Sequence, residues 1–177
     1  MPSSGTIDLF DASTHRTLVI GNSGSGKSWL AARIAARDGV EPVNLDDIYW
    51  IDPLALKKRG AADAKAMAAV AAEGERWVIE GVYGWLIDVA VRRATTLIWL
   101  DLPWADCKAG LLARGASGVS PDEFDNLLAW AEQYWTRQSP SSHAGHAAIF
   151  AAFPGTKITL ASRREVAAFA IALSAAA

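Results

Sequence analysis

The segment Gly21-Asn-Ser-Gly-Ser-Gly-Lys-Ser28 constrains the fold of this chain more than any other feature. It matches the pattern G-x-x-x-x-G-K-[ST], which binds nucleotide phosphates when it lies between a strand and a helix. An apolar run at 17–20 precedes the segment, and a helix-patterned stretch at 29–37 follows it. The pattern therefore predicts a strand, a phosphate-binding loop (the P-loop, residues 21–28) and a helix in succession.

Each residue type in the P-loop suits one task in phosphate binding. Glycines let the backbone curl with its N–H groups pointing inward, and the helix N-terminus adds a partial positive charge. Lys27 is expected to reach the β- and γ-phosphates, and the Ser28 hydroxyl to hold Mg²⁺. We expect the nucleotide to contact eight residues here: Gly21, Ser23, Gly24, Ser25, Gly26, Lys27, Ser28 and Trp29.

The composition indicates one globular domain spanning 1–177, because 51% of the residues are hydrophobic and 20% are charged. The net charge of −2 provides no general attraction to nucleic acid or to an anionic membrane.

No apolar run approaches the roughly 20 residues needed to span a bilayer, and the first residues lack a signal-peptide pattern. A single cysteine, Cys107, excludes internal disulfides and suits a reducing compartment. We therefore expect a cytoplasmic protein and leave its oligomeric state open.

Apolar strands alternate with helical segments from residue 16 onward, which predicts an α/β fold with a parallel sheet covered by helices on both faces. Residues 1–15 are expected to form an N-terminal arm, in which 7–10 form either an edge strand or a covering segment. The main helices are expected at 61–73, 104–114 and 121–137, and another follows a capping box at Ser162-Arg-Arg-Glu165. Five strands are expected: 17–20, 43–45, 77–80, 95–100 and 157–160.

Carboxylates follow three of these strands, where ligands bind in open α/β sheets. Asp46 and Asp47 follow the second strand, and either can engage the acceptor or merely cap the next turn. Asp46 is the first candidate because it lies closer to the strand. Glu80 at the end of the third strand is expected to orient water on Mg²⁺. Asp101 after the fourth strand suits either a metal role or a helix cap.

Phosphoryl transfer also needs positive charge near the transferred group. Residues 114–121 resemble a short lid, with Arg114 at one hinge and Arg137 at the far end of the next helix. Arg114 is our candidate for neutralising transition-state charge, and a surface ion pair is the alternative for either arginine.

Two further patterns are weaker. His143 and His146 have helical spacing, but no third ligand is evident, so a metal site is not expected. Three tryptophans that follow strand ends are candidates for lining a substrate cleft, namely Trp50, Trp85 and Trp104. Four others are expected to pack in the core or on helices, namely Trp77, Trp99, Trp130 and Trp135.

The motifs together resemble a group of small P-loop kinases known as DNA-topology-modulation proteins or adenylate-kinase-related kinases. The resemblance covers most of the chain from residue 16. It rests on the P-loop and on five further stretches: Leu45-Asp-Asp-Ile-Tyr-Trp50, Arg76-Trp-Val-Ile-Glu-Gly-Val-Tyr83, Trp99-Leu-Asp-Leu-Pro103, Leu111-Leu-Ala-Arg114 and Leu160-Ala-Ser-Arg-Arg-Glu-Val166.

This resemblance implies a three-layer αβα fold with strand order 2-3-1-4-5, ATP with Mg²⁺ at the P-loop, and Ser162 and Arg163 near the adenine. Ser28 and Glu80 would be the residues on the metal side. Two departures matter: the family usually has aspartate at the position of Glu80, and the Asp-Gly-Phe-Pro-Arg run of adenylate kinases is missing. AMP is therefore disfavoured as the acceptor.

The leading hypothesis from the sequence is an ATP-dependent phosphotransferase that acts on a small hydroxyl- or phosphate-bearing acceptor. Its catalytic residues would be Lys27, Asp46, Asp47, Glu80 and Arg114. The alternative is an ATP-dependent regulator with slow hydrolysis and no dedicated acceptor. A GTPase is weaker, because no Asn-Lys-x-Asp motif is present.

Overall fold

The computed structural model describes residues 15–52, 57–116 and 120–175, and a five-stranded parallel sheet lies at its centre. The strand order is β2-β5-β1-β6-β7. Numbered along the chain as five strands, this order is 2-3-1-4-5, so the predicted fold class and topology are confirmed. The strands are β1 (Arg16–Gly21), β2 (Pro42–Asn44), β5 (Trp77–Gly81), β6 (Thr96–Leu100) and β7 (Thr156–Leu160).

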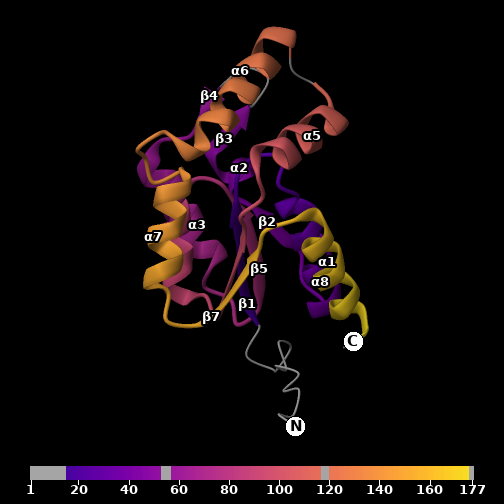
Figure 1. Ribbon diagram of the computed structural model, residues 1–177. Coiled ribbons are helices and arrows are strands. Elements are labelled where there is room, and N and C mark those ends of the chain that lie inside the picture. Colours follow the sequence, from indigo (N-terminus) through magenta and orange to yellow (C-terminus); the bar gives the residue numbers. More distant parts are fainter. Residues whose placement is uncertain (1–14, 53–56, 117–119, 176–177) are drawn as a thin grey trace.

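Helices cover both faces of this sheet and make the fold three-layered (Figure 1). One face carries α1 (Lys27–Asp38) and α8 (Arg163–Ala175). The other carries α3 (Ala61–Ala71), α4 (Gly84–Ala90) and α7 (His143–Ala152), with the 3-10 helix η1 (Val91–Arg93) after α4.

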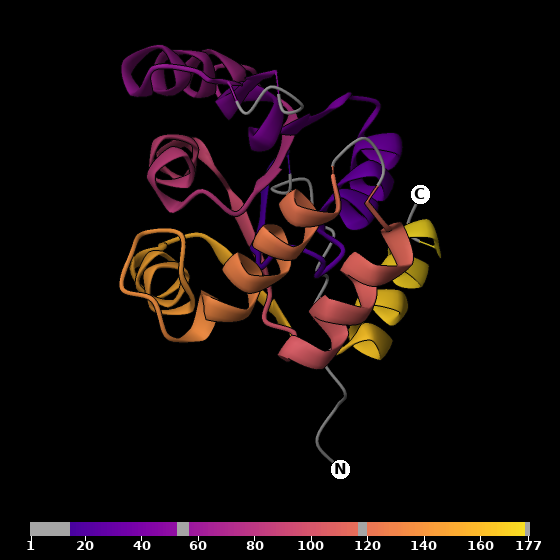
Figure 2. The ribbon, with the colours of Figure 1, turned by 90° about the horizontal axis from the view of Figure 1, so that it is seen from above.

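A second group of elements lies at the carboxyl end of the sheet, with α5 and α6 side by side when the molecule is seen from above (Figure 2). These elements are α2 (Leu45–Tyr49), β3 (Trp50–Asp52), β4 (Lys57–Lys58), α5 (Trp104–Arg114), α6 (Pro121–Glu132) and the 3-10 helix η2 (Gln133–Trp135). The strands β3 and β4 form a separate antiparallel pair.

The central strands β5 and β6 are buried along their whole length, as expected for strands of a parallel sheet covered on both faces. Alternate residues of one strand enter different cores. In β1, Leu18 and Ile20 pack beneath α3, α4 and α7, whereas Val19 packs beneath α1 and α8. Two hydrophobic cores therefore clamp the sheet and fix the positions of its carboxyl ends.

The structure corrects several expected boundaries. Leu45 begins α2 instead of ending β2, because Asn44 caps this helix by accepting a hydrogen bond from Asp46 N. The helix expected at 121–137 ends at Glu132 and continues only as η2. The expected arm at 1–15 lies outside the described residues except for residue 15, and residues 117–119 of the expected lid also lie outside them.

Of the two expected capping boxes, the one at Ser120 is complete and the one at Ser162 is partial. Ser120 and Glu123 form the full reciprocal pair at the start of α6. Ser162 Oγ accepts from Glu165 N, but the Glu165 carboxylate accepts from Ala161 N instead of from Ser162 N. Both sequences therefore start a helix as predicted.

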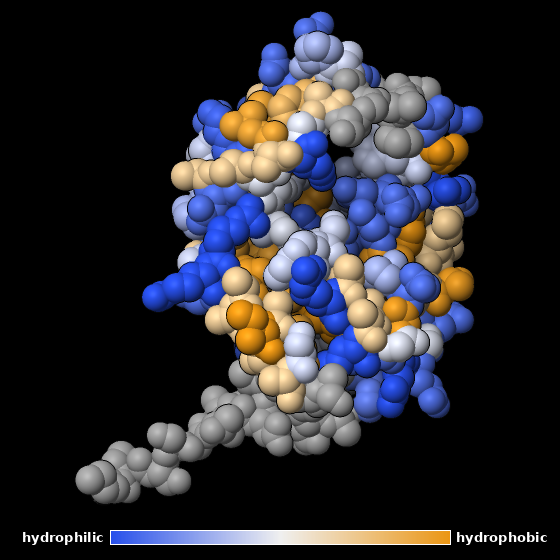
Figure 3. Space-filling model, turned by 90° about the vertical axis from the view of Figure 1, so that its right-hand side faces the viewer, coloured by the Kyte–Doolittle hydropathy of each residue, from blue (hydrophilic) through white to orange (hydrophobic). Residues whose placement is uncertain are grey.

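Hydrophilic and hydrophobic residues are interspersed on the face formed by α1, α5 and α8 (Figure 3). Among the helices of the described part of the chain, none is sufficiently long and apolar to cross a bilayer.

Gly84 provides a test of the packing between α4 and the segment before α7. Its buried N–H donates to Ser141 Oγ at 3.0 Å, and a Cβ added here would overlap the carbonyl oxygen of Pro140. Gly84→Ala should lower the free energy of unfolding by about 1–3 kcal/mol in chemical denaturation. Gly60→Ala is the control, because its added Cβ would meet only Asp63 Oδ2 at 3.7 Å. Equal stability of the two variants would contradict this packing.

Candidate active site

The P-loop leaves β1 at Gly21 and enters α1 at Lys27, as the sequence predicts. Gly24 and Gly26 have φ angles of 77° and 97°, which favour glycine. At Gly24 an added Cβ would also overlap Cys107 O of α5. The Cys107 side chain is buried in the core beneath α1 and α8, and desolvation there raises the pKa of its thiol to about 11. Cys107 therefore supports the P-loop instead of acting as a nucleophile.

Polar groups in the P-loop are arranged to receive an anion. The Lys27 ammonium is buried and donates to Asn22 O at 2.9 Å, so it is held across the loop. Ser25 Oγ is buried and lacks a hydrogen-bond partner among the described residues. An unpaired buried hydroxyl beside an ammonium and the N-terminus of α1 fits a bound phosphate.

Arg163 of α8 braces the P-loop instead of pointing freely into solvent. Its guanidinium donates to Ser25 O at 2.9 Å, to Gly24 O at 2.6 Å and to Asp106 O at 2.9 Å. The positive guanidinium offsets the partial negative charge of these P-loop carbonyl oxygens, which would otherwise repel a phosphate. The adenine contact expected for Arg163 and its neighbour Ser162 stays a prediction.

Ser28 and Glu80 are 52 residues apart in sequence, yet Ser28 Oγ donates to Glu80 Oε1 at 2.6 Å. Burial raises the pKa of Glu80, because desolvation outweighs the opposing effects of Lys27 and the Ser28 hydrogen bond. A hydroxyl and a carboxylate oxygen at this separation are hard oxygen ligands of the kind Mg²⁺ prefers. The pair therefore fits the metal side of a bound nucleotide.

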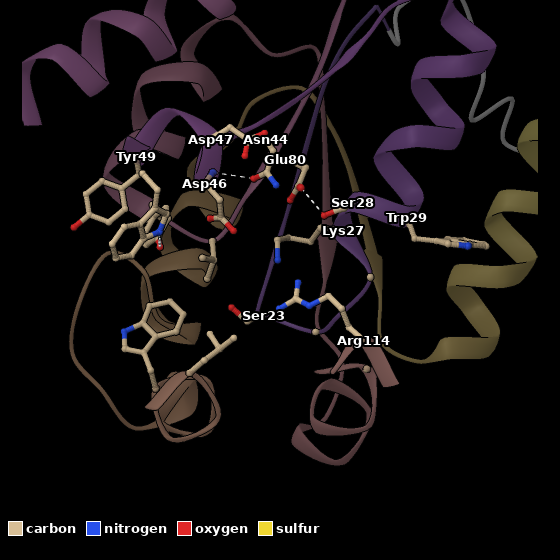
Figure 4. A pocket seen from close by; sticks show the side chains of 18 of the residues that line it. Ser23, Lys27, Ser28, Trp29, Asn44, Asp46, Asp47, Tyr49, Glu80 and Arg114 are labelled. Atoms are coloured by element: carbon tan, nitrogen blue, oxygen red, sulfur yellow. Dashed lines mark hydrogen bonds between the residues drawn. The ribbon is translucent and has the colours of Figure 1, made fainter. Parts of the chain in front are cut away.

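Asp46 and Asp47 lie in the first turn of α2, next to Asn44. The pKa of Asp46 is raised, chiefly by desolvation from the protein around it, and Lys27 partly opposes the shift, while the residue itself stays exposed to solvent at the cavity. In Figure 4 the Asp46 carboxylate lies on the Lys27 side of α2, with Asp47 farther from Lys27. The geometry therefore ranks Asp46 ahead of Asp47 for contact with a reacting group.

Five of these side chains line one cavity of about 720 Å³, namely those of Lys27, Ser28, Asp46, Asp47 and Glu80 (Figure 4). Such a volume is in the range of small-molecule sites. One side, which we call the P-loop end, contains Ser23, Gly24, Gly26, Lys27 and Ser28. The other side, which we call the aromatic end, contains Tyr49, Trp50, Tyr83 and Trp130, with Asp46 between the two ends.

Sequence reasoning missed most of the aromatic end. Trp50 lines the cavity as expected, whereas Trp85 packs behind Tyr49 with ring centroids 5.4 Å apart. Trp130 was expected to pack on a helix, but it lines the cavity. Tyr49 and Tyr83 lie within two of the stretches on which the family resemblance rests, but nothing in the sequence indicated that their rings line a cavity.

The two candidate lid arginines differ in their surroundings. Arg114 ends α5, is exposed, and projects toward Lys27 and Ser23 (Figure 4). Arg137 instead donates to Trp130 O at 2.6 Å and to Ser141 O at 2.6 Å, which makes it structural.

Trp29 lies at the rim of the cavity. Its ring points away from Lys27, and the Arg33 guanidinium lies 3.5 Å from the centroid of this ring.

Asp101 and the two histidines form bonds elsewhere. Asp101 Oδ1 pairs with His143 Nε2 at 3.0 Å, while His146 is buried between Tyr134 Oη and Val82 O. Desolvation lowers the pKa of His146 to about 3, so the ring is neutral. The described residues hold no group of three or more metal-ligating side chains, and Glu80, not Asp101, faces Ser28.

Solved structures of small kinases have the same fold. The chain is similar to an unliganded sugar kinase from Janibacter sp. HTCC2649, with 17% identity and a TM-score of 0.52 over 92% of this chain and 95% of that chain. It is also similar to a gluconokinase from Sinorhizobium meliloti 1021, with 15% identity and a TM-score of 0.51 over 92% and 95% of the two chains. A shikimate kinase from Bacteroides thetaiotaomicron gives 17% identity and a TM-score of 0.54 over 91% and 96%.

The fold is that of the small P-loop kinases. At these identities the likeness shows the fold and not the acceptor. No family model matches the chain, and no curated protein matches its sequence.

Burial of Glu80 leads to a prediction about stability. Its pKa is raised in the folded state, so the folded chain binds the proton more tightly than the unfolded chain. Stability from this group is therefore present at low pH and is lost as the pH rises through the folded pKa. Glu80→Gln should increase the free energy of unfolding at pH 8, and the gain should shrink as the pH is lowered.

Chemical denaturation between pH 5 and 8 measures this difference. Glu75→Gln is the control, because Glu75 is exposed and its replacement should change stability by less than about 0.5 kcal/mol. A Glu80→Gln protein that is less stable than the parent at pH 8 would contradict the prediction.

Proposed function

We propose that this chain is an ATP-dependent phosphotransferase that moves the γ-phosphate to a small acceptor. The observation that carries the proposal is a single cavity with Lys27, Ser28 and Glu80 at one end and Asp46 facing them from α2. Phosphoryl transfer requires positioning and charge stabilisation more than covalent chemistry, and this arrangement supplies both.

The P-loop end would hold the nucleotide. Backbone N–H groups of the loop and the Lys27 ammonium would bind the β- and γ-phosphates, and Ser28 and Glu80 would hold Mg²⁺ directly or through water. When bound, Mg²⁺ neutralises negative charge on the phosphates. Arg114 lies on the same side of the cavity and would stabilise charge on the transferred group.

Asp46 would act as the general base. The acceptor hydroxyl gives its proton to the Asp46 carboxylate while its oxygen forms a bond to the γ-phosphorus. The bond from this phosphorus to the β–γ bridging oxygen breaks, and ADP leaves. A base with a raised pKa accepts a proton more readily, which fits the desolvated surroundings of Asp46.

The alternative, a nucleotide-dependent regulator, requires no acceptor site. The cavity extends well past the P-loop to a carboxylate and four aromatic side chains, which favours an enzyme with a second substrate. Binding of ATP without turnover of any acceptor would instead favour the regulator. A cytoplasmic location and the absence of a nucleic-acid partner stay expectations from the sequence.

Lys27→Met tests the nucleotide site. Loss of a charged hydrogen-bond donor should weaken ATP binding by about 10–100-fold and abolish γ-phosphate transfer. Calorimetric titration with Mg·ATP and transfer from labelled ATP measure the two effects. Lys65→Met is the control, because Lys65 is an exposed residue of α3, and it should behave as the parent. Full transfer by Lys27→Met would overturn the assignment.

Asp46→Asn tests the base. It should lower kcat by about 10²–10⁴-fold while leaving ATP affinity within a few fold. In the parent protein kcat/KM should fall as the pH is lowered through the raised pKa of Asp46, because the protonated carboxyl cannot accept a proton. Asp47→Asn should have a smaller effect on kcat. A larger loss in Asp47→Asn than in Asp46→Asn would reverse the roles.

A further inference from the structure

We propose that the acceptor is an uncharged alcohol attached to a flat unsaturated ring, and not a phosphorylated or carboxylated compound. This inference rests on the proposed function and specifies its second substrate. It is carried by the side chains at the aromatic end of the cavity and by the charges around them.

The aromatic end is built from four rings that come from three parts of the chain. Tyr49 lies 4.6 Å from Tyr83 and 5.2 Å from Trp50 between ring centroids, and Tyr83 lies 6.3 Å from Trp130. Their rings line the cavity beside Val82 and Leu127. A wall made of aromatic faces and edges offers stacking and edge contacts to a planar ring.

Three of the four rings in this wall are held by contacts within the protein. Trp50 Nε1 donates to Tyr83 Oη at 3.1 Å. Arg137 covers the ring of Trp130 with its guanidinium carbon 3.8 Å from the centroid. Because Arg137 is itself tied to Trp130 O and Ser141 O, the indole is held before any ligand arrives. A fixed wall costs little ordering entropy on binding.

The charges at the aromatic end disfavour an anionic acceptor. Asp46 and Asp47 line the cavity next to the aromatic end, and a phosphate would be repelled by both carboxylates. Lys58 also lines the cavity beside these rings, so two carboxylates face one ammonium and the net charge there is negative. Bidentate binding of a phosphate by Arg137 is not available, because its guanidinium is engaged with carbonyl oxygens. Lys27 and Arg114 lie on the P-loop side (Figure 4).

A cationic alcohol is disfavoured by Lys58. Its ammonium lies 5.1 Å from the Trp50 ring centroid and 5.5 Å from that of Tyr49, so a cation already occupies the position over these two rings. A quaternary ammonium ligand would be repelled from the place where cation–π attraction is strongest. An uncharged ring avoids both penalties.

Transfer from ATP to a panel of matched compounds tests the inference. The panel contains nucleosides and hydroxymethyl-substituted aromatic rings, the 5′-monophosphates of the same nucleosides, hexoses and aldonates, and choline. The expected result is the highest kcat/KM, by 10-fold or more, for one of the uncharged ring alcohols. A higher kcat/KM for a monophosphate, a sugar, a sugar acid or choline overturns the inference and leaves the proposed function intact.

Binding measurements cover the case in which turnover is slow. Equilibrium binding of the same panel to the full chain with a non-hydrolysable ATP analogue should again favour a ring alcohol. If no ring alcohol binds or is phosphorylated, the inference is wrong. If ATP binding does not depend on Lys27, the proposed function is wrong.

Replacements of the aromatic side chains provide a second test of the inference. Trp130→Leu and Tyr49→Leu should raise KM for the ring alcohol by about 10-fold or more with a smaller effect on kcat, because a stacked ring is lost. Trp130→Phe should recover most of the affinity. Trp104→Leu is the matched control, since Trp104 does not line the cavity, contrary to the sequence prediction, but lies on α5 and donates to Glu132 Oε1. Equal KM values for Trp130→Leu, Trp104→Leu and the parent, all folded by thermal denaturation, would overturn the role of the wall.

Discussion

The register of β1 between β5 and β6 determines where the P-loop and Glu80 lie relative to each other. Val19 is paired with Glu80 on one side, and Gly21 is paired with Leu100 on the other. This register places Glu80 beside the start of α1, where its carboxylate meets Ser28. A slip of one residue would turn each side chain to the opposite face and separate the pair. The two cores that clamp the sheet therefore also hold the chemistry in place.

The features that were predicted from the sequence are those encoded by neighbouring residues or by simple periodicity. The P-loop motif, the capping sequences and the apolar strands each depend on short stretches, and the sheet order followed from the family resemblance. Glu80 and Asp46 were identified because they end strands, and the carboxyl ends of parallel strands meet at one edge. The structure brings both into one cavity with Lys27.

The features that sequence reasoning missed depend on contacts between distant segments. Trp130 was expected to pack in the core or on a helix, and only the position of α6 beside Tyr83 makes it part of a cavity. Arg137 was missed for a different reason, since its partners Trp130 O and Ser141 O are only seven and four residues away. The helix was expected to run to 137, but it ends at Glu132, and the turn that follows brings these carbonyl groups to the guanidinium. The hydrogen bonds from Arg163 to Ser25 O and Gly24 O join residues that are 138 and 139 positions apart in the sequence.

The aromatic end is carried by short peripheral elements, while the P-loop and Glu80 belong to the buried sheet. Replacements on partly exposed short elements usually cost little stability, whereas replacements in the clamped strands cost much. Side chains on α2, β3 and α6 can therefore change with little effect on the sheet that carries the P-loop and Glu80. The same scaffold is accordingly compatible with very different sequences, and the three kinases that share this fold are only 15–17% identical to this chain.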